Sequence, residues 1–163
     1  MYKKIMVPLD GSELAECVLP HVEGFIASCQ VNTIIFVRAV KPEPMISRGA
    51  YATGEVDFTV IEENTKRIEE EKKASAKNYL DQVVGRLKHD GVEFQTEVIV
   101  GTVAESLIDY AEANHIDMIL IATHGRSGVS RWVRGSIADR ILRGSGIPVL
   151  MVRAPGTMGE KKA

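Results

Sequence analysis

Short apolar runs alternate with amphipathic stretches along this chain. Five runs have the length and apolar content of strands buried in a sheet; one of them alternates before it becomes continuously apolar. These runs are Ile5–Val7, Ile34–Val37, Val92–Val100, Met118–Ala122 and Val149–Val152.

Four helices are expected between the strands, because apolar residues recur there every three or four positions. They span residues 12–28, 58–89, 102–114 and 135–143, whereas 41–57 has no clear period and is expected to be a loop. Thr102 and Glu105 have the spacing of a capping box. The long second helix is highly charged, and its inner stripe is expected to be Ile61, Ile68, Ala76, Leu80, Val84 and Leu87.

This order of strands and helices predicts a single α/β domain of the Rossmann-like, doubly wound kind. Continuous apolar strands that alternate with amphipathic helices indicate a parallel sheet with helices on both faces. In such sheets ligands bind beyond the carboxyl ends of the strands, near the point where the strand order reverses. The loops after the first, second and fourth strands are therefore the expected binding region.

Composition and charge argue against nucleic-acid-binding and membrane-spanning proteins. The 163 residues carry a net charge of −2, which offers no electrostatic match to nucleic acid. The longest apolar stretch, 118–123, is far shorter than the ~20 residues that span a bilayer. We therefore expect no nucleic-acid partner, no membrane and a cytoplasmic location. Cys17 and Cys29 fall in one predicted helix, about 18 Å apart along its axis, so no disulfide is expected between them.

The first candidate loop is Pro8-Leu9-Asp10-Gly11-Ser12. Asp10 and Ser12 both suit the cap of the helix that follows. The alternative is that Asp10, at the carboxyl end of a strand, reaches ligand hydroxyls or a phosphate-bound metal ion.

The second candidate region follows the fourth strand and is rich in glycine, serine and arginine. Gly125, Gly128 and Gly135 let backbone N–H groups approach an anion, and Ser127 and Ser136 add hydroxyl donors. The start of the fourth helix adds free N–H groups and a positive dipole end. From 124 to 143 the net charge is +4, and the remainder of the chain carries −6. This segment therefore suits a polyphosphate; its five arginines are at positions 126, 131, 134, 140 and 143.

The sequence lacks the motifs of several other classes of nucleotide-binding, hydrolytic and metal sites. The chain has no G-x-x-x-x-G-K-[ST] loop, no G-x-G-x-x-G after the first strand and no G-x-S-x-G elbow. Its histidines lack metal-ligand spacing. A nucleotide hydrolase needs a base near the γ-phosphate, and Asp10 and His124 are the only candidates, so little or no turnover is expected.

Three stretches together resemble the universal stress protein family. They are Lys3–Ser12, Ile119–Gly128 with Gly135-Ser136-Ile137-Ala138, and Ile147–Val152. The resemblance covers residues 1–154, with 155–163 left as a flexible tail.

The resemblance implies a five-stranded parallel sheet in the order 3-2-1-4-5 and a nucleotide site. The family's ATP-binding branch carries G-x-x-G, nine residues, then G-[ST]. Gly125, Gly135 and Ser136 fit this pattern, and Ala122 stands in place of the first glycine. The site residues that the resemblance implies are Pro8, Leu9 and Asp10 beside the adenosine, Ala39 and Val40 at the adenine edge, and Ala122, Thr123, Gly125, Arg126, Ser127, Gly128, Gly135, Ser136 and Ile137.

The resemblance also implies a role and partners. The expected ligand is ATP, or ADP or AMP, with Mg²⁺ or Mn²⁺ held through the phosphates. The expected role is nucleotide-dependent regulation in a stress response, through a protein partner that the sequence does not identify. A homodimer through Val149–Val152 is expected as well. The alternatives are a weak ATP hydrolase and a nucleotide-independent interaction protein of the same fold.

Overall fold

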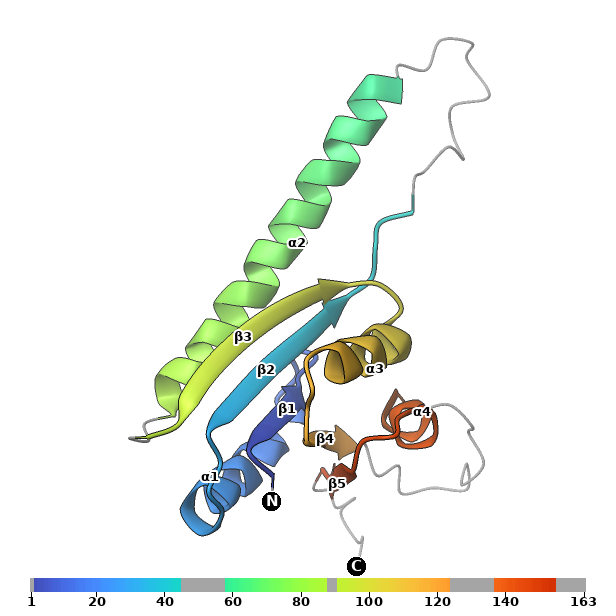
Figure 1. Ribbon diagram of the computed structural model, residues 1–163. Helices are drawn as coiled ribbons and strands as arrows, with labels where there is room; N and C mark the ends of the chain where they lie inside the picture. The colour runs from blue at the N-terminus through green and yellow to red at the C-terminus, as the bar shows by residue number, and fades with distance from the viewer. Residues whose placement is uncertain (1, 45–57, 88–90, 124–136, 155–163) are drawn as a thin grey trace, which may run out of the picture.

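Five parallel strands form one sheet in the order β3-β2-β1-β4-β5, which confirms the predicted order (Figure 1). The computed structural model describes residues 2–44, 58–87, 91–123 and 137–154. The strands are β1 (Lys4–Pro8), β2 (Thr33–Val40), β3 (Glu93–Val100), β4 (Met118–Thr123) and β5 (Val149–Arg153).

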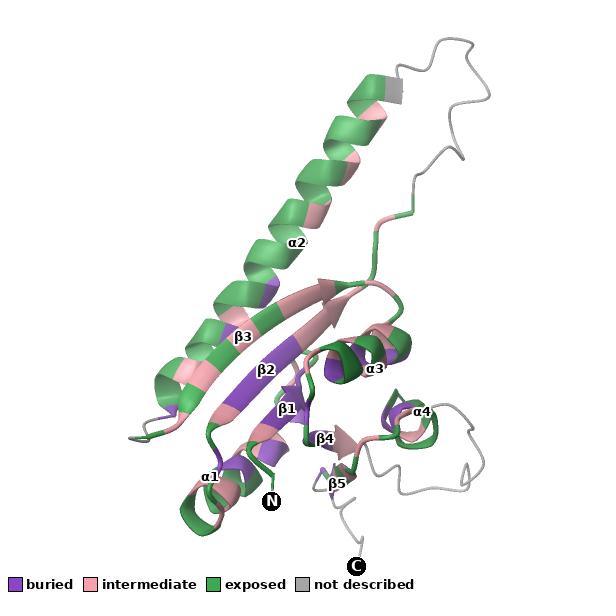
Figure 2. Cartoon of the chain, viewed as in Figure 1, coloured by how far each residue is buried: buried purple, intermediate pink, exposed green. Residues whose placement is uncertain are grey.

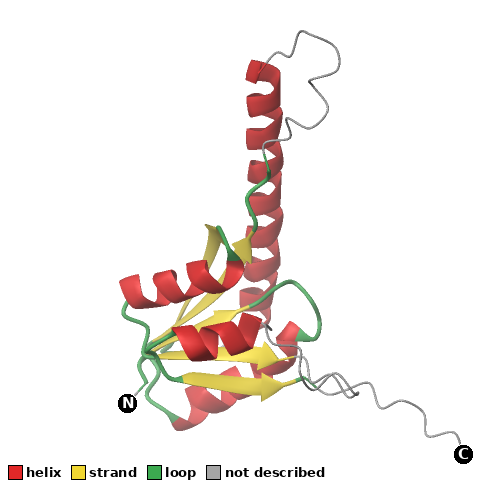
Figure 3. Cartoon of the chain, turned by 90° about the vertical axis from the view of Figure 1, so that its right-hand side faces the viewer, coloured by secondary structure: helices red, strands yellow, loops and turns green. Residues whose placement is uncertain are grey.

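Helices cover both faces of the sheet, as the sequence pattern predicts. On one face lie the short 3₁₀ helix η1 (Ala15–Val18), α1 (Leu19–Ser28) and α2 (Phe58–Arg86). On the other lie α3 (Val103–Ala113) and α4 (Ile137–Gly144). The view in Figure 3 shows helices on either side of the strands. The fold is therefore the predicted doubly wound α/β architecture.

The core lies along the three central strands, which are buried on both faces (Figure 2). Alternate residues of β2 enter opposite cores: Ile34 and Phe36 face α1 and α2, whereas Ile35 and Val37 face α3 and α4. The Phe36 ring stacks on that of Phe94, with 6.4 Å between centroids. Successive residues of these strands are therefore apolar because neither face of the strands contacts water.

The first helical segment differs from the prediction of one helix over 12–28. A 3₁₀ turn over Ala15–Val18 precedes an α-helix that begins only at Leu19. Pro20 explains the break, because it has no N–H to donate to the Glu16 carbonyl. That carbonyl instead accepts the Leu19 N–H in a 3₁₀ pattern. Cys17 and Cys29 are therefore not in one helix, and both are half-buried free thiols.

Helix α2 projects beyond the sheet, so its predicted inner stripe is only half right (Figure 1). Ala76, Leu80, Val83 and Leu87 are buried against β2 and β3, and Val84 is partly buried. Ile68 is 38% exposed, since the outer half of the helix has no strand beneath it. The prediction also missed Val83.

Thr102 precedes α3 as predicted, but its side chain makes no capping hydrogen bond. The Thr102 backbone carbonyl accepts the Ser106 N–H at 2.8 Å, which is the first ordinary hydrogen bond of the helix. The Glu105 carboxylate pairs with Arg140 of α4. The predicted start of the helix is confirmed, but the predicted capping-box hydrogen bond from the Thr102 side chain is not present.

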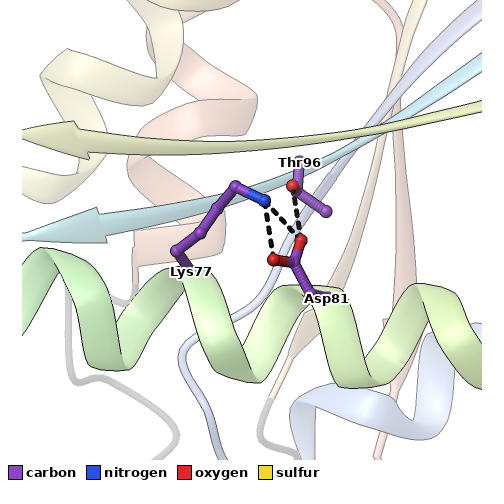
Figure 4. A network of polar contacts seen from close by, with 3 residues as sticks. All are labelled: Lys77, Asp81 and Thr96. Carbon is purple, nitrogen blue, oxygen red and sulfur yellow. Dashed lines mark hydrogen bonds and ion pairs between the residues drawn. The ribbon is translucent and has the colours of Figure 1, made fainter.

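A polar network fastens α2 to the outer strand β3 (Figure 4). The Asp81 carboxylate accepts hydrogen bonds from Lys77 Nζ, at 2.5 and 2.7 Å, and from the Thr96 hydroxyl, at 2.9 Å. Hydrogen bonding to Lys77 and then to Thr96 lowers the pKa of this carboxyl group. The charged face of α2 is therefore also an attachment to the sheet.

Among the described residues, none of the helices combines the length and the apolar character that crossing a membrane requires.

Candidate functional site

Strand β1 ends earlier than the strands on either side of it, at the point where the strand order reverses, and in doubly wound sheets the space beyond this carboxyl end is the usual ligand crevice. Its pairing with β2 stops at Pro8–Val37, whereas β2 continues to Val40. Its pairing with β4 stops at Met6–Ile119, whereas β4 continues to Thr123. Pro8 accounts for the early end on the β4 side, because proline has no N–H to donate to a ladder.

Among the described residues, backbone groups of the neighbouring strands that face this crevice have no ladder partner. In a parallel ladder the N–H and C=O of one residue point to the same side, and successive residues alternate. The Leu9 N–H donates to the Val37 carbonyl at 2.9 Å, so Val37 faces β1. Ala39 then faces the same side, beyond the last pair of β1 and β2. By the same alternation Ala122 of β4 faces the crevice from the opposite side.

The residues next to these two point away from the crevice. The Val40 carbonyl accepts the Gly101 N–H at 3.0 Å, and the Thr123 carbonyl accepts the Ala154 N–H at 3.0 Å. Of each predicted pair, Ala39–Val40 and Ala122–Thr123, only the first member therefore presents its backbone to the space above β1.

The turn after β1 brings a carboxylate to this crevice. The Ser12 N–H donates to Asp10 Oδ1 at 2.9 Å, and the Ser12 hydroxyl accepts the N–H of Ala15 at 3.1 Å. The Ser12 hydroxyl thus bonds to the first residue of η1, although the N-cap position itself is Leu14, which makes no side-chain cap. Asp10 bonds within the turn and remains exposed at the carboxyl end of β1. The turn holds the Asp10 carboxylate at the crevice without burying it.

A charged network lies beneath this turn, and sequence reasoning missed it. The Arg38 guanidinium lies over the Tyr79 ring, with 5.3 Å from Cζ to the ring centroid. Arg86 Nη2 bonds to Glu16 Oε2 at 2.8 Å. Burial first, and then the Glu16 carboxylate, raise the pKa of Tyr79. One signal was available: Arg38 is the only charge in the run Thr33–Val40.

The family model for the universal stress protein family matches residues 1–153 of the chain. The chain belongs to the universal stress protein family.

Individual members of the family resemble this chain over nearly their whole length. Universal stress protein MJ0577 of Methanocaldococcus jannaschii is 26% identical over 156 residues, which cover 94% of this chain and 96% of that protein. A solved structure of MJ0577 has a TM-score of 0.75 at 25% identity, covering 96% of this chain and 99% of its own.

Two further solved structures share the fold at lower identity. One is a universal stress protein in complex with cAMP, with a TM-score of 0.65 at 18% identity over 93% of this chain and 97% of its own. The other is an Arabidopsis thaliana universal stress protein family protein with AMP bound, with a TM-score of 0.59 at 15% identity over 94% of this chain and 93% of its own.

In this universal stress protein, Pro8 and Leu9 are buried, and the Leu9 side chain belongs to the core beneath α1 and α2. Ile137 begins α4 and is 41% exposed. Six further predicted site residues lie outside the described residues: Gly125, Arg126, Ser127, Gly128, Gly135 and Ser136.

Two of the five arginines expected to favour phosphate are paired with carboxylates. Arg143 Nε lies 3.1 Å from Asp139 on α4, and Arg140 forms an ion pair with Glu105 of α3. The Arg143 side chain is therefore paired within α4, and the Arg140 side chain connects α4 to α3. Arg126, Arg131 and Arg134 lie outside the described residues.

Among the residues that the structure describes, no three His, Cys, Asp or Glu side chains gather as metal ligands would.

Proposed function

We propose that this universal stress protein binds ATP, or a closely related adenine nucleotide, in the crevice above β1 and acts as a nucleotide-dependent regulator in the cytoplasm. The observation that carries the proposal is the pair of open backbone edges at Ala39 and Ala122, with the Asp10 carboxylate between them at the end of β1. Ligand binding at the point where strand order reverses is general for this architecture.

The backbone of Ala39 supports recognition of adenine. It offers one N–H donor and one C=O acceptor to the crevice. The adenine amino group at C6 is a donor and suits the carbonyl, whereas guanine has an acceptor oxygen at that position. The backbone therefore favours adenine over guanine once the sugar fixes the direction of the base.

Asp10 supports binding of the sugar. Ribose hydroxyls are donors, and a carboxylate accepts strongly from them. The phosphates would then extend toward the predicted Gly125–Ser136 segment, with Mg²⁺ or Mn²⁺ held through them. The neighbours solved with cAMP and with AMP have this fold, which supports an adenine nucleotide as the class of ligand.

Calorimetric titration with ATP tests the sugar contact. Asp10→Ala is expected to weaken binding about tenfold or more, since it removes a charged acceptor. Glu13→Ala is the matched control, because Glu13 is an exposed carboxylate three residues away in the same segment. Equal affinity of wild type and Asp10→Ala contradicts the assignment of Asp10.

The predicted phosphate segment has its own test. Gly135→Val places a side chain where a backbone N–H is expected to meet phosphate, so ATP affinity should fall strongly. Gly24→Val is the control, because a Cβ at Gly24 meets no atom within 4 Å. Unchanged affinity of Gly135→Val would remove this segment from the site while leaving the crevice intact.

A further inference from the structure

The Arg38 guanidinium has two close neighbours near the carboxyl end of β2. One is the Tyr79 ring on α2, 5.3 Å from Arg38 Cζ. The other is the backbone of Gly11, where a Cβ would lie 2.9 Å from Arg38 Cζ and 2.9 Å from Nη2. The guanidinium therefore packs closely against the turn that carries Asp10.

Gly11 is the residue that permits this contact. Its φ is +91°, a region that side chains with a Cβ rarely adopt. A Cβ there would also meet the Arg38 guanidinium. The backbone conformation thus requires glycine at the centre of the turn, and the missing Cβ leaves room for the guanidinium.

The surroundings show that Arg38 is part of a charged network. Burial and the Glu16 and Asp10 carboxylates raise the pKa of the Tyr79 phenol, whereas the Arg38 guanidinium lowers it. Glu16 is in turn bonded to Arg86 of α2. Arg38 thus joins the Asp10 turn to a helix more than forty positions later in the chain.

We propose that Arg38 is a positioning residue of the nucleotide site, which holds the Asp10–Ser12 turn against Tyr79 and so fixes the direction of the Asp10 carboxylate. The proposal rests on the proposed function for its effect on binding. The chemistry suits arginine, because a planar guanidinium stacks on an aromatic face, whereas the compact ammonium of lysine does not.

The first test needs no nucleotide. The Ser12 N–H, which donates to Asp10 Oδ1, reports on the turn. NMR measurement of amide exchange should show it exchanging about tenfold faster in Arg38→Met than in wild type. Arg67→Met is the control, since Arg67 lies on the outer half of α2 and pairs with Glu71. If Arg38→Met does not fold, Tyr79→Leu removes the other side of the stack and should have the same effect.

The second test measures ATP affinity by calorimetry. Arg38→Met should weaken binding about tenfold, and Arg38→Lys should recover only part of the loss. In an Asp10→Ala background, Arg38→Met should cause no further loss, because Arg38 acts through Asp10. Losses that add in the double variant would overturn the positioning role and place Arg38 in direct contact with the ligand.

The two tests separate the two proposals. Wild type that binds no ATP contradicts the proposed function, while the Ser12 exchange rate still decides the role of Arg38. Exchange at the wild-type rate in both Arg38→Met and Tyr79→Leu would overturn the positioning role whatever the affinity.

Discussion

At the scale of the residue, single backbone donors and acceptors determine where neighbouring strands stay hydrogen-bonded and where their pairing stops. Pro8 ends the pairing of β1 with β4, and Ala122 of β4 presents the backbone that this ending leaves open. At the opposite end of β1, the Asp117 carboxylate provides the hydrogen-bond partner: its Oδ2 accepts the backbone N–H of Lys3 and of Lys4, each at 2.8 Å.

Asp117 gives a prediction about stability and pH. The backbone N–H of Lys4 is the main cause that lowers the pKa of this carboxyl group. Because the folded-state pKa lies below the unfolded value of about 3.9, the stabilisation is complete above that value and is lost as the pH falls through the folded-state pKa. Asp117→Asn should cost about 1 kcal/mol at neutral pH, a low value because the carboxylate is exposed.

Denaturant unfolding of both proteins across this pH range measures the effect. The difference between wild type and Asp117→Asn should shrink as the pH falls below about 4. Asp109→Asn, an exposed carboxylate on α3, is the control. A difference that is constant from neutral to acid pH would show that the charge of Asp117 does not act through these bonds.

Residues that act alone were easier to predict than residues that act together. The bond of the Ser12 hydroxyl to the start of the first helical segment is the kind of contact that local sequence indicates. The contact of Arg38 with Gly11 and Tyr79 joins three segments distant in the chain, and no local pattern records such a contact. A single charge inside an apolar strand was the only visible trace of it.

At the scale of the element, strands were predicted closely and the long helix only in part. The three central strands are buried on both faces, so their apolar runs mark where they lie. The apolar spacing of α2 continues into its outer half, where no strand lies beneath it (Figure 2). Periodicity marks the face that a helix turns inward, but it does not show how far the sheet extends.

This division of α2 is testable with two truncations of similar size. Leu80 is fully buried, so Leu80→Ala should cost about 2–5 kcal/mol. Ile68 is 38% exposed, so Ile68→Ala should change stability by less than about 0.5 kcal/mol. Chemical denaturation of both variants decides the point, and similar losses would mean that the outer half is covered by a partner or by another segment.

At the scale of the whole molecule, the sheet has two outer strands of unlike character. On β3 the exposed side chains include Glu93, Gln95 and Glu97, which discourage pairing with another sheet. On β5 Val149 and Met151 are partly buried, and Leu150 is 37% exposed. An apolar outer strand favours association, so β5 rather than β3 is the expected dimer interface.

The ladder also shows which proline substitution tests the dimer. The Pro148 carbonyl and the Ala154 N–H both bond to β4, so by alternation Leu150 faces β4 and Met151 faces the open edge. Met151→Pro should therefore convert a dimer into a folded monomer, as light scattering with thermal unfolding would show. Val98→Pro, the equivalent edge position on β3, should leave the dimer intact. Wild type that is monomeric at micromolar concentration contradicts the prediction.

The central claim is that the backbone of β2 and the Asp10 carboxylate form a site for adenine nucleotides. Calorimetric titration of the wild-type protein with ATP and, separately, with GTP tests it most directly. The account predicts that ATP binds and that GTP binds more weakly by about 1–3 kcal/mol, the discrimination that a matched pair of hydrogen bonds to a base provides. No binding of ATP at millimolar concentration, or equal affinity for the two nucleotides, would contradict it.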